Sequence, residues 1–174
     1  SMKGSYLGPN FDQDIIEQKL NNYGAKFDIV EEDEMIEQIA QALADGNAIG
    51  WFQGKMEFGP RSLGNRSIIG DPRSENMQRR LNLKVKYRES FRPFAPSVLK
   101  EDLNEWFELD YDSPYMLFVA KVKQSKCITM TSEEEALFGI DKLNIKRSSI
   151  PAVTHVDYSA RIQTVYKETN ARYH

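Results

Sequence analysis

The stretch that decides the fold is Gln53-Gly-Lys-Met-Glu-Phe-Gly-Pro-Arg-Ser-Leu-Gly-Asn-Arg-Ser67. It combines three glycines and a proline with three basic side chains, directly after a short apolar stretch. Glycine has no side chain to block a ligand and accepts positive φ, so successive N–H groups can point into one concavity. The planar fork of arginine suits the oxygens of phosphates and carboxylates. The run therefore predicts a loop that binds an anion.

A purely structural interpretation of this run stays open. Its arginines can pair with acidic side chains elsewhere in the chain, while its glycines serve turns. The sequence contains neither G-x-x-x-x-G-K-[ST] nor a G-x-G-x-x-G that opens a helix. The run is therefore not a P-loop or a Rossmann fingerprint.

Residues 55–92 form a basic island in an acidic chain. They carry ten basic and four acidic side chains, whereas the whole chain has a net charge of −3. A nucleic-acid surface usually brings a basic excess to the whole domain. The island therefore favours a small anionic ligand, and RNA binding is the weaker alternative.

Length and composition indicate a single globular domain. The chain has 174 residues, of which 40% are hydrophobic and 28% charged, an ordinary globular balance. No apolar run approaches eighteen residues and no secretory signal begins the chain, so we expect no membrane segment and a cytoplasmic protein. The single Cys127 agrees with a reducing compartment and lies in a polar stretch unsuited to a nucleophile. We interpret residues 1–5 as an added, disordered start and residues 6–174 as the domain.

Hydrophobic periodicity predicts helices over residues 11–22, 33–45, 74–85 and 100–107. Extended segments are predicted at residues 26–30, 47–52, 67–70, 92–99, 151–155 and 161–165. The almost wholly apolar residues 114–122 are expected to form a central strand. The polar residues 123–149 are interpreted as an insertion or mobile loop with a short helix near 133–138. A helix, a strand and a glycine-rich loop follow one another here, an α/β order in which ligands gather at strand ends.

Two further groups of side chains are candidates for chemistry. On an extended segment, Lys86 and Arg88 would project from one face and could converge on one anion. The alternative is an exposed charged connector. His155 and Asp157 could act together, although a His-x-Asp pair is more often structural. The sequence has no cluster with zinc-ligand spacing, so we expect no metal site in this chain.

Several blocks carry a family resemblance when taken in order with the glycine-rich run. They are Asp71-Pro-Arg73, Lys86-Tyr-Arg88-Glu, Phe91-Arg-Pro-Phe-Ala-Pro96, Ser113-Pro-Tyr-Met116, Pro151-Ala-Val-Thr-His-Val-Asp157 and Ala160-Arg-Ile-Gln-Thr164. Over residues 6–174 the chain resembles the C-terminal YrdC-like domain of O-carbamoyltransferases that act in nodulation-factor and antibiotic tailoring (the NodU/CmcH family). The resemblance implies an α/β fold with a twisted mixed sheet flanked by helices. It also implies that a C-terminal helix and strand are lacking.

The resemblance implies a function as well. In this family the YrdC-like domain makes carbamoyl adenylate and pyrophosphate from carbamoyl phosphate and ATP with its Mg²⁺. A separate N-terminal domain, which holds the family's metal site, passes the carbamoyl group to a substrate hydroxyl. The catalytic residues carried over are Lys86, Arg88, Arg92 and Arg161. The nucleotide-binding residues carried over are Gly59, Arg61, Asn65, Arg66 and Ser67, with Gln53 and Glu57 as further candidates. The alternative is a non-catalytic nucleotide- or anion-binding regulatory module.

Overall fold

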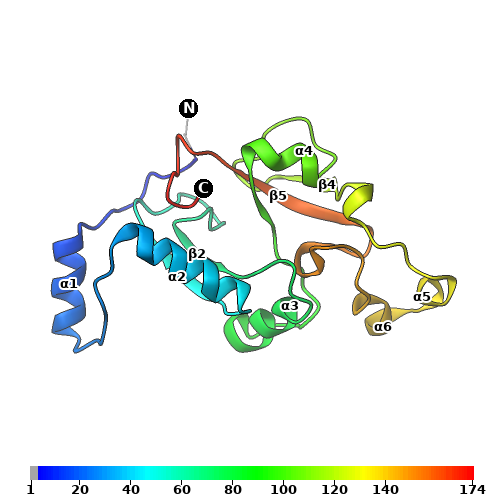
Figure 1. Cartoon of the computed structure of the whole chain (residues 1–174), viewed down its shortest axis with the longest axis horizontal. Coiled ribbons are helices and arrows are strands. Elements are labelled where there is room, and N and C mark those ends of the chain that lie inside the picture. Colours follow the sequence, from blue (N-terminus) through cyan, green and yellow to red (C-terminus); the bar gives the residue numbers. More distant parts are fainter. Residues whose placement is uncertain (1–3) are drawn as a thin grey trace. The chain divides into compact units, whose positions relative to one another are not determined.

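The computed structural model describes residues 4–174 and has a mixed α/β fold, as predicted (Figure 1). Residues 1–3, within the stretch interpreted as an added start, lie outside the described residues. The chain forms two compact units, the first ending at Ile69 and the second running from Gly70 to His174. The carbonyl oxygen of Ser5 accepts hydrogen bonds from the N–H groups of Leu7 (2.9 Å) and Phe58 (2.7 Å). The domain boundary at Tyr6 stays a prediction.

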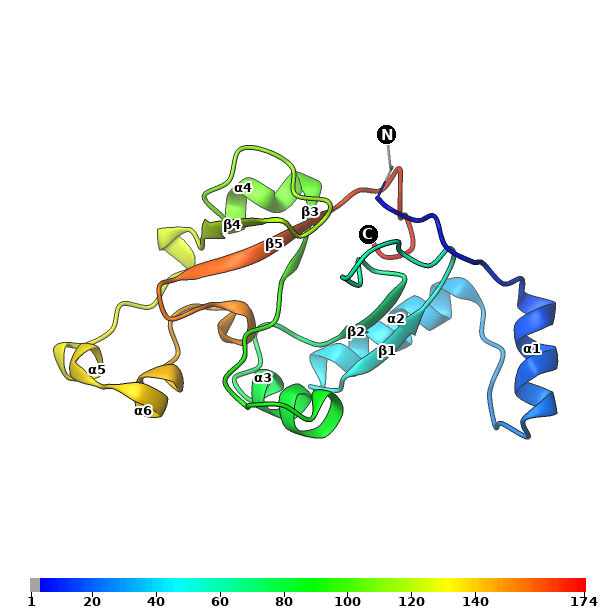
Figure 2. The same cartoon turned by 180° about the vertical axis from the view of Figure 1, so that it is seen from behind.

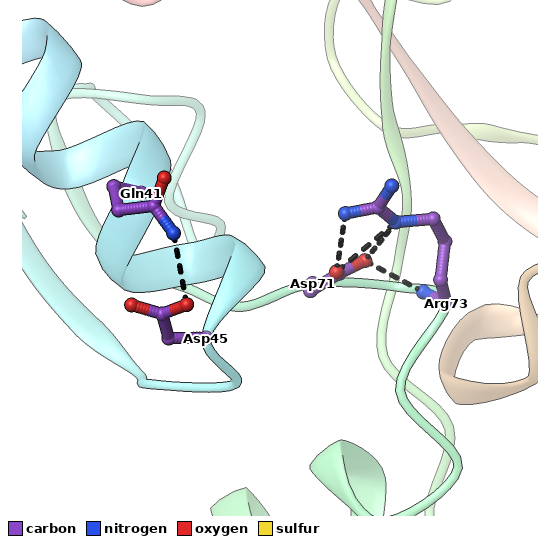
Figure 3. A network of polar contacts seen from close by, with 4 residues as sticks. All are labelled: Gln41, Asp45, Asp71 and Arg73. Carbon is purple, nitrogen blue, oxygen red and sulfur yellow. Dashed lines mark hydrogen bonds and ion pairs between the residues drawn. The ribbon is translucent and has the colours of Figure 1, made fainter.

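The first unit contains α1 (Gln13–Asn22), α2 (Glu32–Ala44), β1 (Ile49–Phe52) and β2 (Arg66–Ile69). Both helices confirm the periodicity, whereas the strand predicted at 26–30 is wrong because these residues form an irregular connection between the helices. The helix α2 lies beside β1 and β2, and α1 stands away from them (Figures 1 and 2). Three acidic residues in the first turn of α2 complement the helix dipole. In its last turn Gln41 donates a 2.9 Å hydrogen bond to Asp45 (Figure 3).

The glycine-rich run connects two antiparallel strands. In the register of β1 and β2, Phe52 lies opposite Arg66. The N–H of Gln53 then donates to the carbonyl of Asn65 at 3.0 Å and extends the ladder by one step. The loop therefore begins at the end of the strand β1, as the predicted order of helix, strand and loop has it, and the two strands that it joins are antiparallel. The loop is the long tip of a hairpin.

The second unit is built on a mixed sheet of β3 (Ser97–Leu99), β5 (Ser159–Val165) and β4 (Phe118–Lys121) in that order. The strand β3 is parallel to β5, and β4 is antiparallel to it. The prediction of a central strand at 114–122 is wrong in its placement, since β4 is an edge strand and Val119 is 57% exposed. The central strand is β5, which buries six of its seven residues although its sequence includes polar side chains.

One face of this sheet carries the core of the second unit. Ala160 and Ile162 of β5 are fully buried there. They pack in one cluster with side chains from β3, from α4 (Leu103–Trp106), which follows the 3₁₀ turn η2 (Lys100–Asp102), and from later parts of the chain. The cluster comprises Val98, Leu103, Phe107, Leu109, Val122, Ile150, Val153, Ala160 and Ile162. The predicted helix at 100–107 is thus confirmed and covers the sheet (Figure 2).

The helix predicted at 74–85 changes its pitch midway. It begins as α3 (Met77–Leu81) and continues as the π-helical turn η1 (Asn82–Lys86). Met77 and Leu81 are buried. Gly70 allows Met77 to approach, because a Cβ at position 70 would lie 2.8 Å from the methionine sulfur.

Residues 123–149 contain the 3₁₀ turn η3 (Gln124–Lys126) and the short helices α5 (Ser132–Ala136) and α6 (Gly139–Leu143), before the 3₁₀ turn η4 (Pro151–Val153). The helix predicted near 133–138 is confirmed as α5, which Thr131 and Glu134 begin with a capping box. At the base of this segment, the N–H of Ile128 donates to the carbonyl of Arg147 at 2.7 Å. The chain entering residues 129–146 and the chain leaving them are therefore hydrogen-bonded to each other.

Arg147 binds the end of α6 through its side chain. Its side chain is buried, and burial lowers the pKa of its guanidinium. The guanidinium donates to the carbonyl oxygens of Ile145 (2.9 Å), Leu143 (3.4 Å) and Lys142. The end of a helix leaves carbonyl groups without intrahelical partners. Arg147 supplies those partners for α6.

We predict that Arg147→Ala destabilises the chain by about 2 kcal/mol, because three partly buried carbonyl groups lose a charged donor together. Hydrogen exchange of the amides in residues 139–147 should accelerate. The neighbouring variant Lys146→Ala serves as the control, since Lys146 only forms a solvent-exposed ion pair with Glu75, and such pairs contribute about 0–1 kcal/mol. Equal effects of the two substitutions would contradict this role of Arg147.

Candidate functional site

The glycine-rich loop surrounds a carboxylate of its own chain. Glu57 is only 4% exposed, and its Oε1 accepts hydrogen bonds from the N–H groups of Leu63 (2.7 Å), Asn65 (2.7 Å) and Arg66 (3.1 Å). Burial by itself would raise the pKa of Glu57, but the backbone hydrogen bonds together outweigh it, and the pKa lies below its ordinary value. The N–H groups of the glycine-rich loop thus hold a carboxylate of their own chain, and the predicted binding of a ligand anion stays a prediction.

Arg66 clamps the two ends of this loop together. Its Nη1 donates to the carbonyl oxygens of Gln53 (2.5 Å) and Asn65 (2.8 Å), and its Nη2 donates to that of Gly54 (3.1 Å). The guanidinium carbon lies 3.5 Å from the centre of the Phe52 ring, a cation–π arrangement. Arg66 therefore holds the loop, and its predicted contact with a nucleotide stays a prediction.

Asn65 and Ser67 also take part in this framework. The amide Nδ2 of Asn65 donates to the carbonyl of Lys55 at 2.7 Å, and the hydroxyl of Ser67 accepts from the N–H of Gly64 at 3.0 Å. Gly59 is exposed and has a φ of +122°, which favours glycine. Arg61 is half-buried, and in the described chain its buried Nε has no hydrogen-bond partner. Of the predicted nucleotide-binding side chains, Arg61 thus keeps an unsatisfied donor.

In the second unit, Asn82 organises the segment that carries three of the predicted catalytic residues. Its side chain is fully buried, at 0% exposure. The Nδ2 donates to the carbonyl oxygens of Ser90 (3.1 Å) and Arg92 (2.7 Å), and the Oδ1 accepts from Nε of Arg88 (2.6 Å). Its backbone carbonyl accepts from the N–H groups of Tyr87 and Arg88. One asparagine thus fixes the chain from residue 87 to residue 92.

The three predicted cations of this segment differ in how they are held. Arg88 is bonded to Asn82 and lies 5.0 Å from the centre of the Phe94 ring, while Arg92 forms a 2.9 Å ion pair with Glu89. Lys86 is exposed, and within residues 4–174 no hydrogen bond or ion pair engages its side chain. The expected extended geometry of Lys86 and Arg88 is wrong, because Lys86 ends the π-helix and Tyr87 adopts the left-handed conformation.

Arg161 lies on the central strand β5, in register with Val119 of β4. It is half-buried and acts electrostatically on His155. Burial is the main cause that lowers the pKa of His155, Arg161 lowers it further, and Asp157 opposes both. Asp157 itself accepts from the hydroxyl (2.6 Å) and N–H (3.1 Å) of Ser159. These contacts favour the structural interpretation of the His155–Asp157 pair. Arg161 lies close enough to His155 to lower its pKa.

Arg73 shows that the basic island is partly neutralised within the chain. Its Nε and Nη2 donate to the carboxylate of Asp71 at 2.9 and 2.7 Å, and its N–H donates to the same group at 2.9 Å (Figure 3). The hydrogen bond from Arg73 is the main cause of the lowered pKa of Asp71. The fork of Arg73 is thus occupied by Asp71.

The sequence analysis missed Asn82 and gave Glu57 only a secondary place. The available signals were a polar residue beside the buried face of a predicted helix, and a single acid among three glycines. Among residues 4–174, no three His, Cys, Asp or Glu side chains gather as a metal site would require. No helix in this described part is long and apolar enough to cross a membrane.

We predict that Glu57→Gln lowers the free energy of unfolding by about 2 kcal/mol at pH 7, because charge-assisted hydrogen bonds are stronger than neutral ones. The folded-state pKa of Glu57 lies below its unfolded value of about 4.3, so its contribution is present above that pH and is lost as the pH falls through the folded pKa. Denaturant titrations from pH 7 to pH 3 should show a weaker pH dependence in the variant. Glu37→Gln, on the exposed face of α2, is the control, and an identical pH profile for wild type and Glu57→Gln would contradict the role of this carboxylate.

Asn82→Ala should destabilise the chain by about 3 kcal/mol, since the groups of Arg88, Ser90 and Arg92 that bond to the buried Asn82 side chain lose this partner together. The amides of residues 87–92 should exchange faster, and Asn82→Asp should recover only part of the loss because a carboxylate cannot donate to Ser90 and Arg92. Asn76→Ala, at an exposed position without a side-chain cap, should have little effect. Unchanged exchange in Asn82→Ala would show that the segment is held by other contacts.

Comparison with known proteins places these features in a family. The family model for the carbamoyltransferase C-terminus matches residues 40–174. An uncharacterized protein of Synechocystis sp. is 58% identical over all of this chain, which corresponds to 29% of the relative's length. The nodulation protein NolNO of Sinorhizobium fredii is 44% identical over 97% of the chain and 22% of its own length. The 3'-hydroxymethylcephem-O-carbamoyltransferase of Streptomyces clavuligerus is 38% identical over 78% of the chain and 22% of its own length. The chain spans less than a third of each of these relatives, and it belongs to the carbamoyltransferase C-terminal family.

Proposed function

We propose that the chain binds ATP and carbamoyl phosphate and forms carbamoyl adenylate for transfer to a substrate hydroxyl. A separate N-terminal domain would carry out the transfer, and the fold would be of the YrdC type. Membership of the carbamoyltransferase C-terminal family supports the reaction class. The observation that carries the proposal is the cationic segment of residues 86–92, which a buried asparagine fixes while the ammonium group of Lys86 keeps no partner in the described chain.

The reaction needs cations because it brings two polyanions together. Positioned cations lower the cost of that approach and stabilise the charge that develops in the transition state. No protein nucleophile is required. Mg²⁺ that arrives with ATP would be held mainly by phosphates and water, which agrees with its usual mode of binding. It would share the neutralisation of the triphosphate with the protein side chains.

The described contacts suggest different roles for the predicted residues. Lys86 is free to meet a phosphate, and Arg161 offers a half-buried guanidinium beside His155. Arg92 would have to exchange Glu89 for the ligand, at small cost because that ion pair is exposed. Arg88 is tied to Asn82 and is better suited to orienting the segment than to leaving it. In the first unit, the buried Nε of Arg61 has no hydrogen-bond partner in the described chain, and we infer that the guanidinium of this half-buried residue serves a ligand of the glycine-rich loop.

The balanced reaction consumes water. Carbamoyl phosphate must release its phosphate to water before the resulting carbamate oxygen can attack the α-phosphorus of ATP. The bond between the α- and β-phosphates then breaks, and pyrophosphate leaves with the electron pair. Phosphate and pyrophosphate should therefore appear in equal amounts. A regulatory module that only binds nucleotide or anion, the alternative function, would release neither.

We predict that calorimetry detects binding of ATP with Mg²⁺ and of carbamoyl phosphate to the chain. Lys86→Ala should weaken ATP binding about tenfold or more, as expected for a lost charged hydrogen bond, and Arg161→Ala should weaken binding of at least one ligand. Lys84→Ala is the matched control, because Lys84 is exposed on the same π-helix and is likewise unpaired within residues 4–174. Pyrophosphate release that requires both ligands would favour the enzyme, and binding without release would favour the regulatory module. Absence of binding of either ligand would overturn the proposal.

A further inference from the structure

Tyr87 combines backbone strain with almost complete exposure. Its φ of 48° and ψ of 50° place a bulky aromatic residue in the left-handed region, which favours glycine. Its side chain is nevertheless 86% exposed. Among residues 4–174, the other non-glycine residues with positive φ are Ser5, Met116 and Tyr158, and none of them is classed as exposed. Packing of the Tyr87 side chain inside the chain therefore contributes little to offset its backbone strain.

The strain is imposed by the residues on either side. The N–H groups of Tyr87 and Arg88 both donate to the backbone carbonyl of Asn82, and the side chain of Arg88 is bonded to the Asn82 amide. Asn82 is fully buried, so this anchor is firmly set in the second unit. Strained residues that the surrounding structure over-determines gather at binding and catalytic sites, and single π-helical turns do the same. The exposed ring is thus presented by a fixed support.

The neighbours of Tyr87 indicate what the ring could bind. Lys86 precedes it and keeps an unpaired ammonium group within the described chain, and Arg88 follows it. An exposed aromatic face beside basic side chains is the combination that proteins use to stack a nucleobase while they neutralise its phosphates. A tyrosine loses little side-chain entropy on binding because it has only two side-chain torsions. The chemistry of the segment therefore matches a nucleotide better than an inorganic anion.

We propose that Tyr87 stacks on the purine base of ATP while Lys86 meets its phosphates. The inference rests on the nucleotide binding proposed above and adds the residue that distinguishes ATP from a bare polyphosphate. A stacked base needs a flat face and no hydrogen-bond pattern, so the site would bind other purine nucleotides with similar strength. The left-handed backbone at Tyr87 is then part of the binding site, because it points the ring away from the protein.

The test compares ATP with inorganic tripolyphosphate by calorimetry, using the whole chain and four variants. Wild type should bind ATP more tightly than tripolyphosphate. Tyr87→Ala should weaken ATP binding by about tenfold or more, the range expected for one lost stacked base, and should leave tripolyphosphate binding unchanged. Tyr87→Phe should retain ATP binding because it keeps the ring. Tyr23→Ala, which removes a tyrosine that is 87% exposed in the first unit, should change neither affinity.

Tyr87→Gly separates stacking from backbone strain. Glycine accepts positive φ at no steric cost, so this variant should have a melting temperature equal to or above that of wild type while it loses the preference for ATP over tripolyphosphate. Equal ATP affinities of wild type and Tyr87→Ala, or equal losses for both ligands, would overturn the stacking role and leave the proposed function intact. A wild-type chain that binds neither ligand would overturn the proposed function and this inference with it.

Discussion

A single buried carboxylate oxygen, Oε1 of Glu57, keeps the long connection between β1 and β2 in one conformation. The loop has many backbone N–H groups and no regular ladder to satisfy them, and a buried N–H without a partner is costly. A charge under the surface is costly as well unless donors surround it. Oε1 of Glu57 accepts hydrogen bonds from the N–H groups of residues 63, 65 and 66, so the buried charge gains donors and the N–H groups gain an acceptor. The side chains of Asn65, Arg66 and Ser67 are then held in a framework that this carboxylate sets.

The second unit uses the same device with an amide in place of a carboxylate. Asn82 supplies donors and acceptors to residues 87–92, which form no helix or strand. Polar groups that are completely satisfied in this way rigidify a segment and specify one conformation. The cationic side chains therefore differ in how far contacts within the chain already engage them. Arg66, Arg73 and Arg88 are committed to the fold, whereas Lys86 is available to a ligand.

Much of this architecture could be predicted from the sequence, and the failures have physical reasons. The apolar stripe of α2, the strand β1 and the short helix near residues 133–138 are local features, and local features can be read from one chain. The positions of β4 and β5 could not, because hydropathy marks apolar runs and β5 buries Ser159, Gln163 and Thr164 by hydrogen bonding and packing. The backbone N–H groups of the glycine-rich run form a site for a carboxylate of the same chain, and its predicted binding of a ligand anion stays a prediction. That Glu57 would occupy this site depends on the tertiary position of one side chain, which spacing does not reveal.

The number of residues in the π-helical turn of residues 82–86 decides the direction in which Lys86 leaves the helix. The backbone hydrogen bonds of a π-helical turn span five residues, one more than those of an α-helical turn. Successive helical residues are related by a rotation of about 100°. Deleting Leu83 or Val85 would keep every charged side chain of this turn and would rotate Lys86 by about 100° about the helix axis, away from its present direction. Relatives that differ here by a single insertion or deletion would present a different surface, even where every charged side chain is retained.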